Sequence, residues 1–92
     1  MQTQIFRGTA RNIYRSPDST DFWYHKTCIV QSKIDGAIRL HSGCWRTPTT
    51  KNAMNQASNQ FNLGFCVYQR DFDWFVTWRG VELPFRDGMI LE

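Results

Sequence analysis

The sequence lacks long hydrophobic runs and has few cysteines, and both features narrow the class of protein. The longest apolar stretches are a few residues, such as Trp74-Phe75-Val76, so we expect no membrane-spanning segment. The first residues do not combine a basic region with an apolar stretch, and we therefore expect no secretory signal. Because Cys28, Cys44 and Cys66 cannot all pair with one another, we expect reduced thiols in a cytoplasmic protein.

Aromatic residues, by contrast, are abundant. The chain has seven Phe, four Trp and three Tyr, which together make up 15% of its 92 residues. Hydrophobic residues make up 41% and charged residues 21%. This composition argues against disorder, and a chain of this length fits a single domain, which we place at residues 1–92. The aromatic rings either fill the core or stack with the bases of a nucleic acid, and composition leaves both interpretations open.

The net charge of +3 conceals an uneven distribution along the chain. Residues 1–51 contain eight Lys or Arg and three Asp, which gives +5, and residues 52–92 contain three Arg and five Asp or Glu, which gives −2. The sequence therefore predicts a surface with a basic side and an acidic side, which suits partners of either sign. The alternative is that these charges are ordinary solvated side chains.

The order of extended and helical patterns predicts an α+β fold, an antiparallel β-sheet with one amphipathic helix packed on one face. Extended segments are expected at residues 4–15, 22–34 and 37–42, and turn-forming residues at 16–21 separate the first two. A meander follows the helix, with strands at 65–70, 74–79 and 81–85. Residues 89–91 are expected to pack as an apolar tail.

The clearest hairpin turns at Asp35-Gly36, because these residues tolerate the positive φ angles of a type I′ turn. A two-residue loop pairs Ile34 with Ala37 and fixes which side chains share a face. The more apolar face, which we expect to meet the core, carries Thr27, Ile29, Gln31, Ile38, Leu40 and Cys44. The opposite face, which we expect to point outward, carries Cys28, Val30, Ser32, Arg39 and His41.

One helix is predicted after Pro48. Thr49 or Thr50 can cap its first turn, because a side-chain hydroxyl there accepts a hydrogen bond from a free backbone amide. The apolar residues at helical spacing are Ala53, Met54, Ala57 and Phe61. The sequence Asn-Leu-Gly at 62–64 ends the helix. The helix depends on this apolar stripe docking on a sheet, because its other side is rich in amides, which form helices poorly.

Two histidines and two cysteines have the spacing of metal ligands, His25-x-x-Cys28 and His41-x-x-Cys44. The expected register places His25 with Cys44 on one face of the hairpin and Cys28 with His41 on the other, because an offset of three residues in a strand inverts the side. Ligands that a sheet divides cannot converge on one ion. We therefore expect no metal and no other cofactor.

Patterns for catalysis are equally sparse. Cys28 with His41 is the one nucleophile and base that the expected register brings to one face, and a packed thiol near a surface histidine explains the pair as well. Asp71 and Asp73 flank a turn, where Asp is common for conformational reasons. Phosphate-binding and dinucleotide-binding glycine patterns are missing. We therefore expect a protein that is not an enzyme and has no small-molecule substrate.

Basic residues and amides are the candidate contacts to a partner. Arg and Lys side chains follow phosphates beside aromatic platforms, and Asn and Gln side chains contact bases or protein surfaces. The same residues can form an ordinary solvated surface, and that interpretation stays open. The candidate residues for binding a partner or a nucleic acid are Arg11, Arg15, Lys26, Lys33, Arg39, Arg46, Lys51, Asn52 and Asn55.

Three stretches resemble small proteins encoded by tailed bacteriophages and prophages. They are CWRTPTTKNAMNQA at 44–57, VYQRDFDWFV at 67–76 and PFRDGM at 84–89, and together they span about half of the chain. The resemblance implies a phage origin, with the host cytoplasm as the location. It implies no particular activity, because many such proteins have no assigned function.

The size and character of the chain also resemble an anti-CRISPR protein that acts on a type I-F system. This resemblance implies a non-enzymatic inhibitor that binds the proteins and guide RNA of a host CRISPR surveillance complex and blocks hybridisation of target DNA. The basic half would contact RNA or acidic protein patches. The acidic residues Asp71, Asp73, Glu82 and Asp87 would occupy Lys or Arg positions meant for DNA. The alternative is a small nucleic-acid-binding phage module that acts alone.

Overall fold

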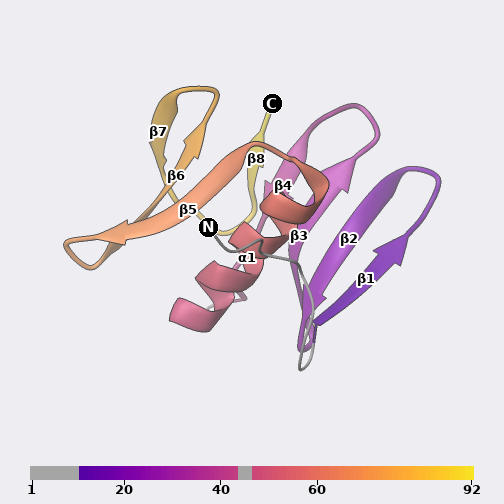
Figure 1. Ribbon diagram of the computed structural model, residues 1–92, viewed down its shortest axis with the longest axis horizontal. Helices are drawn as coiled ribbons and strands as arrows, with labels where there is room; N and C mark the ends of the chain where they lie inside the picture. The colour runs from indigo at the N-terminus through magenta and orange to yellow at the C-terminus, as the bar shows by residue number, and fades with distance from the viewer. Residues whose placement is uncertain (1–10, 44–46) are drawn as a thin grey trace.

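The computed structural model describes residues 11–43 and 47–92. Within these ranges, eight strands and one helix follow in the order β1 (Arg11–Arg15), β2 (Ser19–Tyr24), β3 (Thr27–Lys33), β4 (Ile38–Leu40), α1 (Pro48–Phe61), β5 (Phe65–Arg70), β6 (Asp73–Trp78), β7 (Val81–Pro84) and β8 (Met89–Leu91) (Figure 1). Three predictions fall outside the described residues: the extended segment before residue 11, the core-facing Cys44 and the candidate contact Arg46. No helix in the described ranges is long and apolar enough to cross a membrane.

The predicted α+β class is confirmed, but the strands form two antiparallel sheets where one was expected. The first sheet has the order β1-β2-β3-β4-β8, and the second has the order β5-β6-β7. Residues 89–91 pack on the core as expected, since Leu91 is buried, but they do so as strand β8, which pairs with β4 and places Leu91 opposite Ile38. β8 is thereby the edge strand of the first sheet, next to β4. The meander β5-β6-β7 after the helix forms the second sheet.

The turn between β3 and β4 differs from the expected one by one residue. The Lys33 N–H donates to the Ala37 carbonyl at 2.9 Å, so the loop has three residues rather than two. Val30 therefore lies opposite Leu40, and Gln31 lies opposite Arg39. The prediction that Val30 points outward and Gln31 points into the core is wrong on both counts, since Val30 is fully buried and Gln31 shares the outward face with Arg39.

An irregularity in the pairing of β2 with β3 explains why two successive residues are buried. The register shifts between Phe22 and Trp23, so that Val30 lies opposite Phe22 while Cys28 lies opposite Trp23. Ile29 lies in this bulge, which adds a residue to one strand and allows Ile29 to face the core beside Val30. The outward position predicted for Cys28 and Arg39 agrees with this register, whereas Ser32, also expected outward, lies opposite the buried Ile38 on the core side.

The helix begins slightly earlier than predicted. Its N-cap is Thr47, whose hydroxyl accepts a hydrogen bond from the Thr50 backbone N–H at 3.2 Å, so the expected caps at Thr49 or Thr50 are wrong. Pro48 suits the first helical position because it has no N–H to leave unpaired. The helix ends at Phe61, and its C-cap Asn62 adopts a left-handed φ of 55°, in agreement with the predicted stop at residues 62–64.

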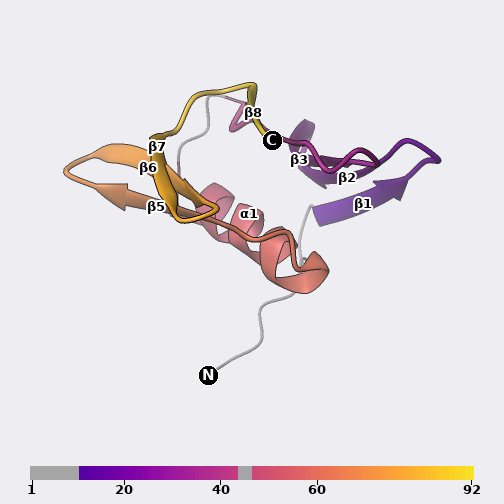
Figure 2. The same ribbon diagram turned by 90° about the horizontal axis from the view of Figure 1, so that it is seen from above.

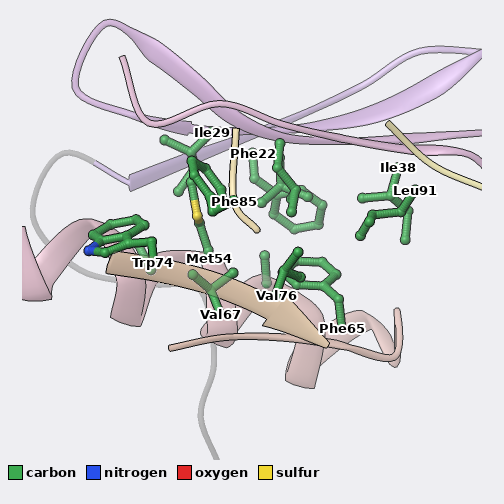
Figure 3. Packing of buried hydrophobic residues seen from close by; sticks show 14 residues of the cluster. Phe22, Ile29, Ile38, Met54, Phe65, Val67, Trp74, Val76, Phe85 and Leu91 are labelled. Atoms are coloured by element: carbon green, nitrogen blue, oxygen red, sulfur yellow. The ribbon is translucent and has the colours of Figure 1, made fainter. Parts of the chain in front are cut away.

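The core lies between the five-stranded sheet on one side and α1 with the second sheet on the other (Figure 3). The predicted stripe of Ala53, Met54 and Ala57 is fully buried, and the Phe61 ring packs edge-on to Phe22 with centroids 5.0 Å apart. The buried aromatic residues of the described ranges are Phe22, Phe65, Trp74 and Phe85. Tyr24, Phe61 and Trp78 pack against this core as well, whereas Tyr14 and Phe72 are exposed.

Candidate nucleic-acid interface

The face of the five-stranded sheet that points away from α1 carries aromatic, basic and amide side chains. Ile13 and Phe22 lie opposite each other and face the core, so their strand neighbours Tyr14 and Trp23 face the other way. Figure 2 shows α1 on one side of β1, β2 and β3. We call the opposite side the open face; its described members are Asn12, Tyr14, Ser19, Asp21, Trp23, Cys28, Gln31, Lys33, Arg39 and Ile90.

Tyr14 and Trp23 form an aromatic pair on the open face. Their ring centroids are 6.2 Å apart and the rings are nearly perpendicular, at 89°. Tyr14 is 59% exposed, which is high for a tyrosine in a strand. Contact with Trp23 restricts the Tyr14 ring without burying it, so part of its aromatic surface stays accessible on the open face.

Two of the predicted basic residues lie on the same face. Arg39 pairs with Gln31 across β3 and β4, and Lys33 follows Gln31 by two residues on β3. Asp21 is the carboxylate of this face, and it accepts a hydrogen bond from the Ser19 hydroxyl at 2.9 Å. The open face thus combines two cations, one anion that is already hydrogen-bonded, and the amide of Gln31.

Cys28 lies on the open face opposite Trp23, and its thiol is partly buried. Burial, with a smaller contribution from the negative charge of Asp21, raises the pKa of its thiol from 9.0 to about 11, although Arg39 acts in the opposite direction. The thiol donates a weak hydrogen bond to the Val30 carbonyl at 3.6 Å, and the His41 Nδ1 accepts one from the Gly43 N–H at 2.8 Å. Both side chains are therefore engaged with nearby backbone groups.

Arg11 and Arg15 lie on the other side of β1, toward the helix. Four residues apart in a strand, they share one face, and each guanidinium lies over an aromatic ring: Arg11 at 5.0 Å from the Tyr24 centroid and Arg15 at 5.2 Å from that of Phe61. Lys26 is exposed in the turn between β2 and β3. The structure therefore does not bring these three predicted contacts onto the open face with Lys33 and Arg39.

The predicted contacts on α1, Lys51, Asn52 and Asn55, also lie away from the open face. The Lys51 ammonium lies 6.0 Å from the ring centroid of Trp74, beside the second sheet, and Asn52 is exposed. Asn55 has a different role from the predicted one, because its side-chain amide is hydrogen-bonded to the backbone of Val67 through both of its polar atoms. An amide used in this way has little capacity left for a partner.

A hollow of about 680 Å³ lies beside the turn between β2 and β3 and the start of α1. Its lining residues are Tyr24, His25, Lys26, Thr27, Ile29, Ser42, Thr47 and Thr50. The hydroxyls of Thr47 and Thr50 lie 3.1 Å apart and are hydrogen-bonded to each other. Within residues 11–43 and 47–92, no three His, Cys, Asp or Glu side chains come together as metal ligands would.

Sequence reasoning missed the aromatic pair of the open face. The signal was present in the alternation of residues 11–15, where a single apolar side chain, Ile13, lies between Asn12 and Tyr14. Reading that alternation requires the strand's partner to be known, because only the pairing of Ile13 with the buried Phe22 shows which side is outward.

The comparisons with known proteins point to a phage family. A family model described as Kyanoviridae Gp96 protein matches residues 3–92, which is nearly the whole chain. No curated protein and no solved structure matches the chain.

Proposed function

This chain belongs to the Kyanoviridae Gp96 protein family, a family of phage proteins, and from that premise we propose that it is a non-enzymatic inhibitor that binds a host ribonucleoprotein. In this proposal the open face contacts single-stranded RNA. The target is the guide RNA and proteins of an RNA-guided CRISPR surveillance complex, which the resemblance of the sequence to anti-CRISPR proteins suggests. Binding there blocks hybridisation of target DNA by occupying its place.

The observation that carries the proposal is the Tyr14–Trp23 pair beside Arg39 and Lys33. Proteins that bind single strands combine aromatic rings, on which bases stack, with cations that neutralise phosphates. Strand-borne side chains are rigid, so the rings of the open face lose little freedom when a base stacks on them. The exposed Tyr14 ring is the surface on which we expect the first base to lie.

The distribution of charge favours RNA held in a protein complex over free nucleic acid. The open face has only one more cation than anions, which supports few phosphate contacts and therefore weak affinity for a bare strand. Asp71 and Asp73, at the turn between β5 and β6, are exposed; they repel phosphates and suit a basic protein surface, whereas Glu82 is already paired with Arg70. A protein with both surfaces gains affinity where RNA and basic protein lie side by side.

Binding measurements with an assembled type I-F surveillance complex, its free guide RNA and single-stranded DNA test the proposal. The informative variant is Tyr14→Ala with Arg39→Glu, which removes a ring and reverses a charge on the open face. Its control is Lys26→Glu, which reverses the charge of an exposed residue in the turn between β2 and β3, away from both the open face and the second sheet.

Tight binding of the complex, weak binding of the free strands and a loss confined to the open-face variant support an inhibitor of the complex. Free RNA bound as tightly as the complex supports the second candidate, a nucleic-acid-binding module that acts alone, because the same face serves both. If the protein binds neither the complex nor the free strands, both functions are wrong.

A further inference from the structure

The turn between β5 and β6 holds an exposed phenylalanine in a backbone conformation that phenylalanine rarely adopts. Arg70 pairs with Asp73, so the turn has two central residues, Asp71 and Phe72, and their φ angles are 53° and 72°. Two positive φ angles are the pattern of a type I′ turn. The Phe72 side chain is 93% exposed, so core packing does not account for its presence.

The next turn of the same sheet provides an internal comparison. Trp78 pairs with Val81, and the central residues Arg79 and Gly80 have φ angles of 51° and 79°, close to those of Asp71 and Phe72. Glycine is the preferred residue at this second position, because it has no Cβ to clash with the backbone. Phe72 occupies the position that Gly80 occupies in the matching turn, and it is a strained choice there.

The hairpin presents this residue away from the body of the protein. Figures 1 and 2 both place the turn between β5 and β6 at the far end of the hairpin, remote from the five-stranded sheet. Behind the turn, the Arg70 guanidinium is paired with Glu82 at 2.7 Å and lies 4.7 Å from the ring centroid of Phe75. Arg70, the strand residue next to the turn, is therefore in contact with both other strands of the second sheet.

Two carboxylates flank the exposed ring. Asp71 precedes Phe72, Asp73 follows it, and both are exposed. Negative charge on both sides excludes a phosphate backbone as the natural occupant and favours lysine or arginine side chains. An apolar ring between two anions is complementary to an apolar pocket with a basic rim.

We propose that Phe72 is an anchor that inserts into an apolar pocket of a partner protein, with Asp71 and Asp73 pairing with Lys or Arg residues at the rim of that pocket. The backbone strain is the cost of presenting a ring at the most projecting point of the hairpin. This inference deepens the protein contact that the proposed function gives to Asp71 and Asp73, and it concerns a surface apart from the open face.

The substitution Phe72→Gly separates binding from stability. Glycine relieves the strained φ, so we expect this variant to melt at a higher temperature than the wild type, by about 4 °C or more. We expect the same variant to bind the partner about 30-fold or more weakly, the loss typical of an interface hot spot. A variant that melts no higher, or that binds the partner as well as the wild type, overturns the proposal.

Site-specific photo-crosslinking identifies the partner. Phe72→p-benzoylphenylalanine keeps an aromatic ring at the tip, and Ile34→p-benzoylphenylalanine, at a residue 80% exposed in the turn between β3 and β4, is the control. Both proteins are irradiated in lysate of infected host cells, and the crosslinked residue of the captured protein is mapped by mass spectrometry.

A crosslink specific to position 72 that maps to an apolar pocket bordered by Lys or Arg, and that Asp71→Asn with Asp73→Asn reduces several-fold, supports the proposal. Crosslinks to RNA, to a second copy of this chain, or to the same proteins as the control overturn it. The adduct reports on the tip alone, so its absence leaves the RNA-binding measurements on the open face unaffected.

Discussion

Asn55 of α1 is hydrogen-bonded to the backbone of Val67 in β5 in both directions: its Nδ2 donates to the Val67 carbonyl at 2.8 Å, and its Oδ1 accepts from the Val67 N–H at 2.7 Å. One turn further along the helix, the Ser58 hydroxyl makes the same two kinds of contact with the backbone of Phe65. β5 is an edge strand, and α1 thereby satisfies backbone groups that would otherwise be free to pair with another chain.

The first prediction concerns this contact. Asn55→Ala leaves a backbone donor and acceptor of Val67 without their partner, and we expect it to lower the free energy of unfolding by about 1–3 kcal/mol. Asn52→Ala, on the exposed side of the same helix, is the control and should change that free energy by less than about 0.5 kcal/mol. Urea denaturation of both variants measures the difference, and equal stabilities would show that the Asn55 contact contributes nothing.

The second prediction concerns the aromatic pair of the open face. We expect Tyr14→Ala to weaken binding of the surveillance complex by about 1–3 kcal/mol, the range for a ring that stacks with one base. Because Tyr14 is 59% exposed and loses only its ring contact with Trp23, its removal should cost about 1 kcal/mol of stability, and the variant should stay folded. Interferometry on the immobilised complex gives the affinity, and wild-type affinity in the variant would remove Tyr14 from the interface.

The third prediction uses salt to count phosphate contacts. Neutralising a phosphate releases counterions, so each such contact adds roughly 0.7 to the steepness of the plot of log affinity against log salt for a single strand. We expect Lys33→Gln and Arg39→Gln each to reduce the slope by about that amount, while Arg79→Gln leaves it unchanged. Identical slopes in all three variants would place the phosphates elsewhere.

The fourth prediction follows from the pKa of Cys28. The folded protein holds this thiol protonated up to a pKa of about 11, so its thiolate fraction at pH 8 is roughly 100-fold lower than that of an ordinary thiol at 9.0. The exposed Cys66 should therefore react with iodoacetamide well before Cys28, and Cys28 should become reactive only as the pH approaches 11. Peptide mapping follows each site; equal rates at pH 8 would contradict the raised pKa.

Much of the fold could be predicted from the sequence, because several segments carry strong local signals. The apolar spacing of Ala53, Met54 and Ala57 located the helix, and the alternation of 65–70 and 74–79 located the meander. The register of β3 with β4 was missed by one residue. Gly36 alone adopts a positive φ, and the Asp35 carboxylate accepts the Ala37 N–H at 2.9 Å, so Asp35 supports a three-residue loop instead of the type I′ turn that the dipeptide suggested.

The candidate site was only partly predictable for a similar reason. Charge selected Lys33 and Arg39, which share the open face, but it also selected Arg11 and Arg15, which face the helix side. The charge of a residue does not show from which face of the sheet its side chain points. That face depends on strand pairings between residues far apart in the sequence. The hydrogen bonds of Asn55 to β5 could not be predicted either. An amide side chain that contacts the backbone of a strand stands in the same local sequence pattern as a solvated one.

The most direct test of the central claim is the hybridisation of labelled target DNA to the guide RNA of the surveillance complex in the presence of this protein. We predict that stoichiometric wild-type protein abolishes hybridisation and that the variant Tyr14→Ala with Arg39→Glu, folded and equally concentrated, restores it. Hybridisation that the wild type leaves intact, or that the open-face variant blocks as completely as the wild type, would contradict the account.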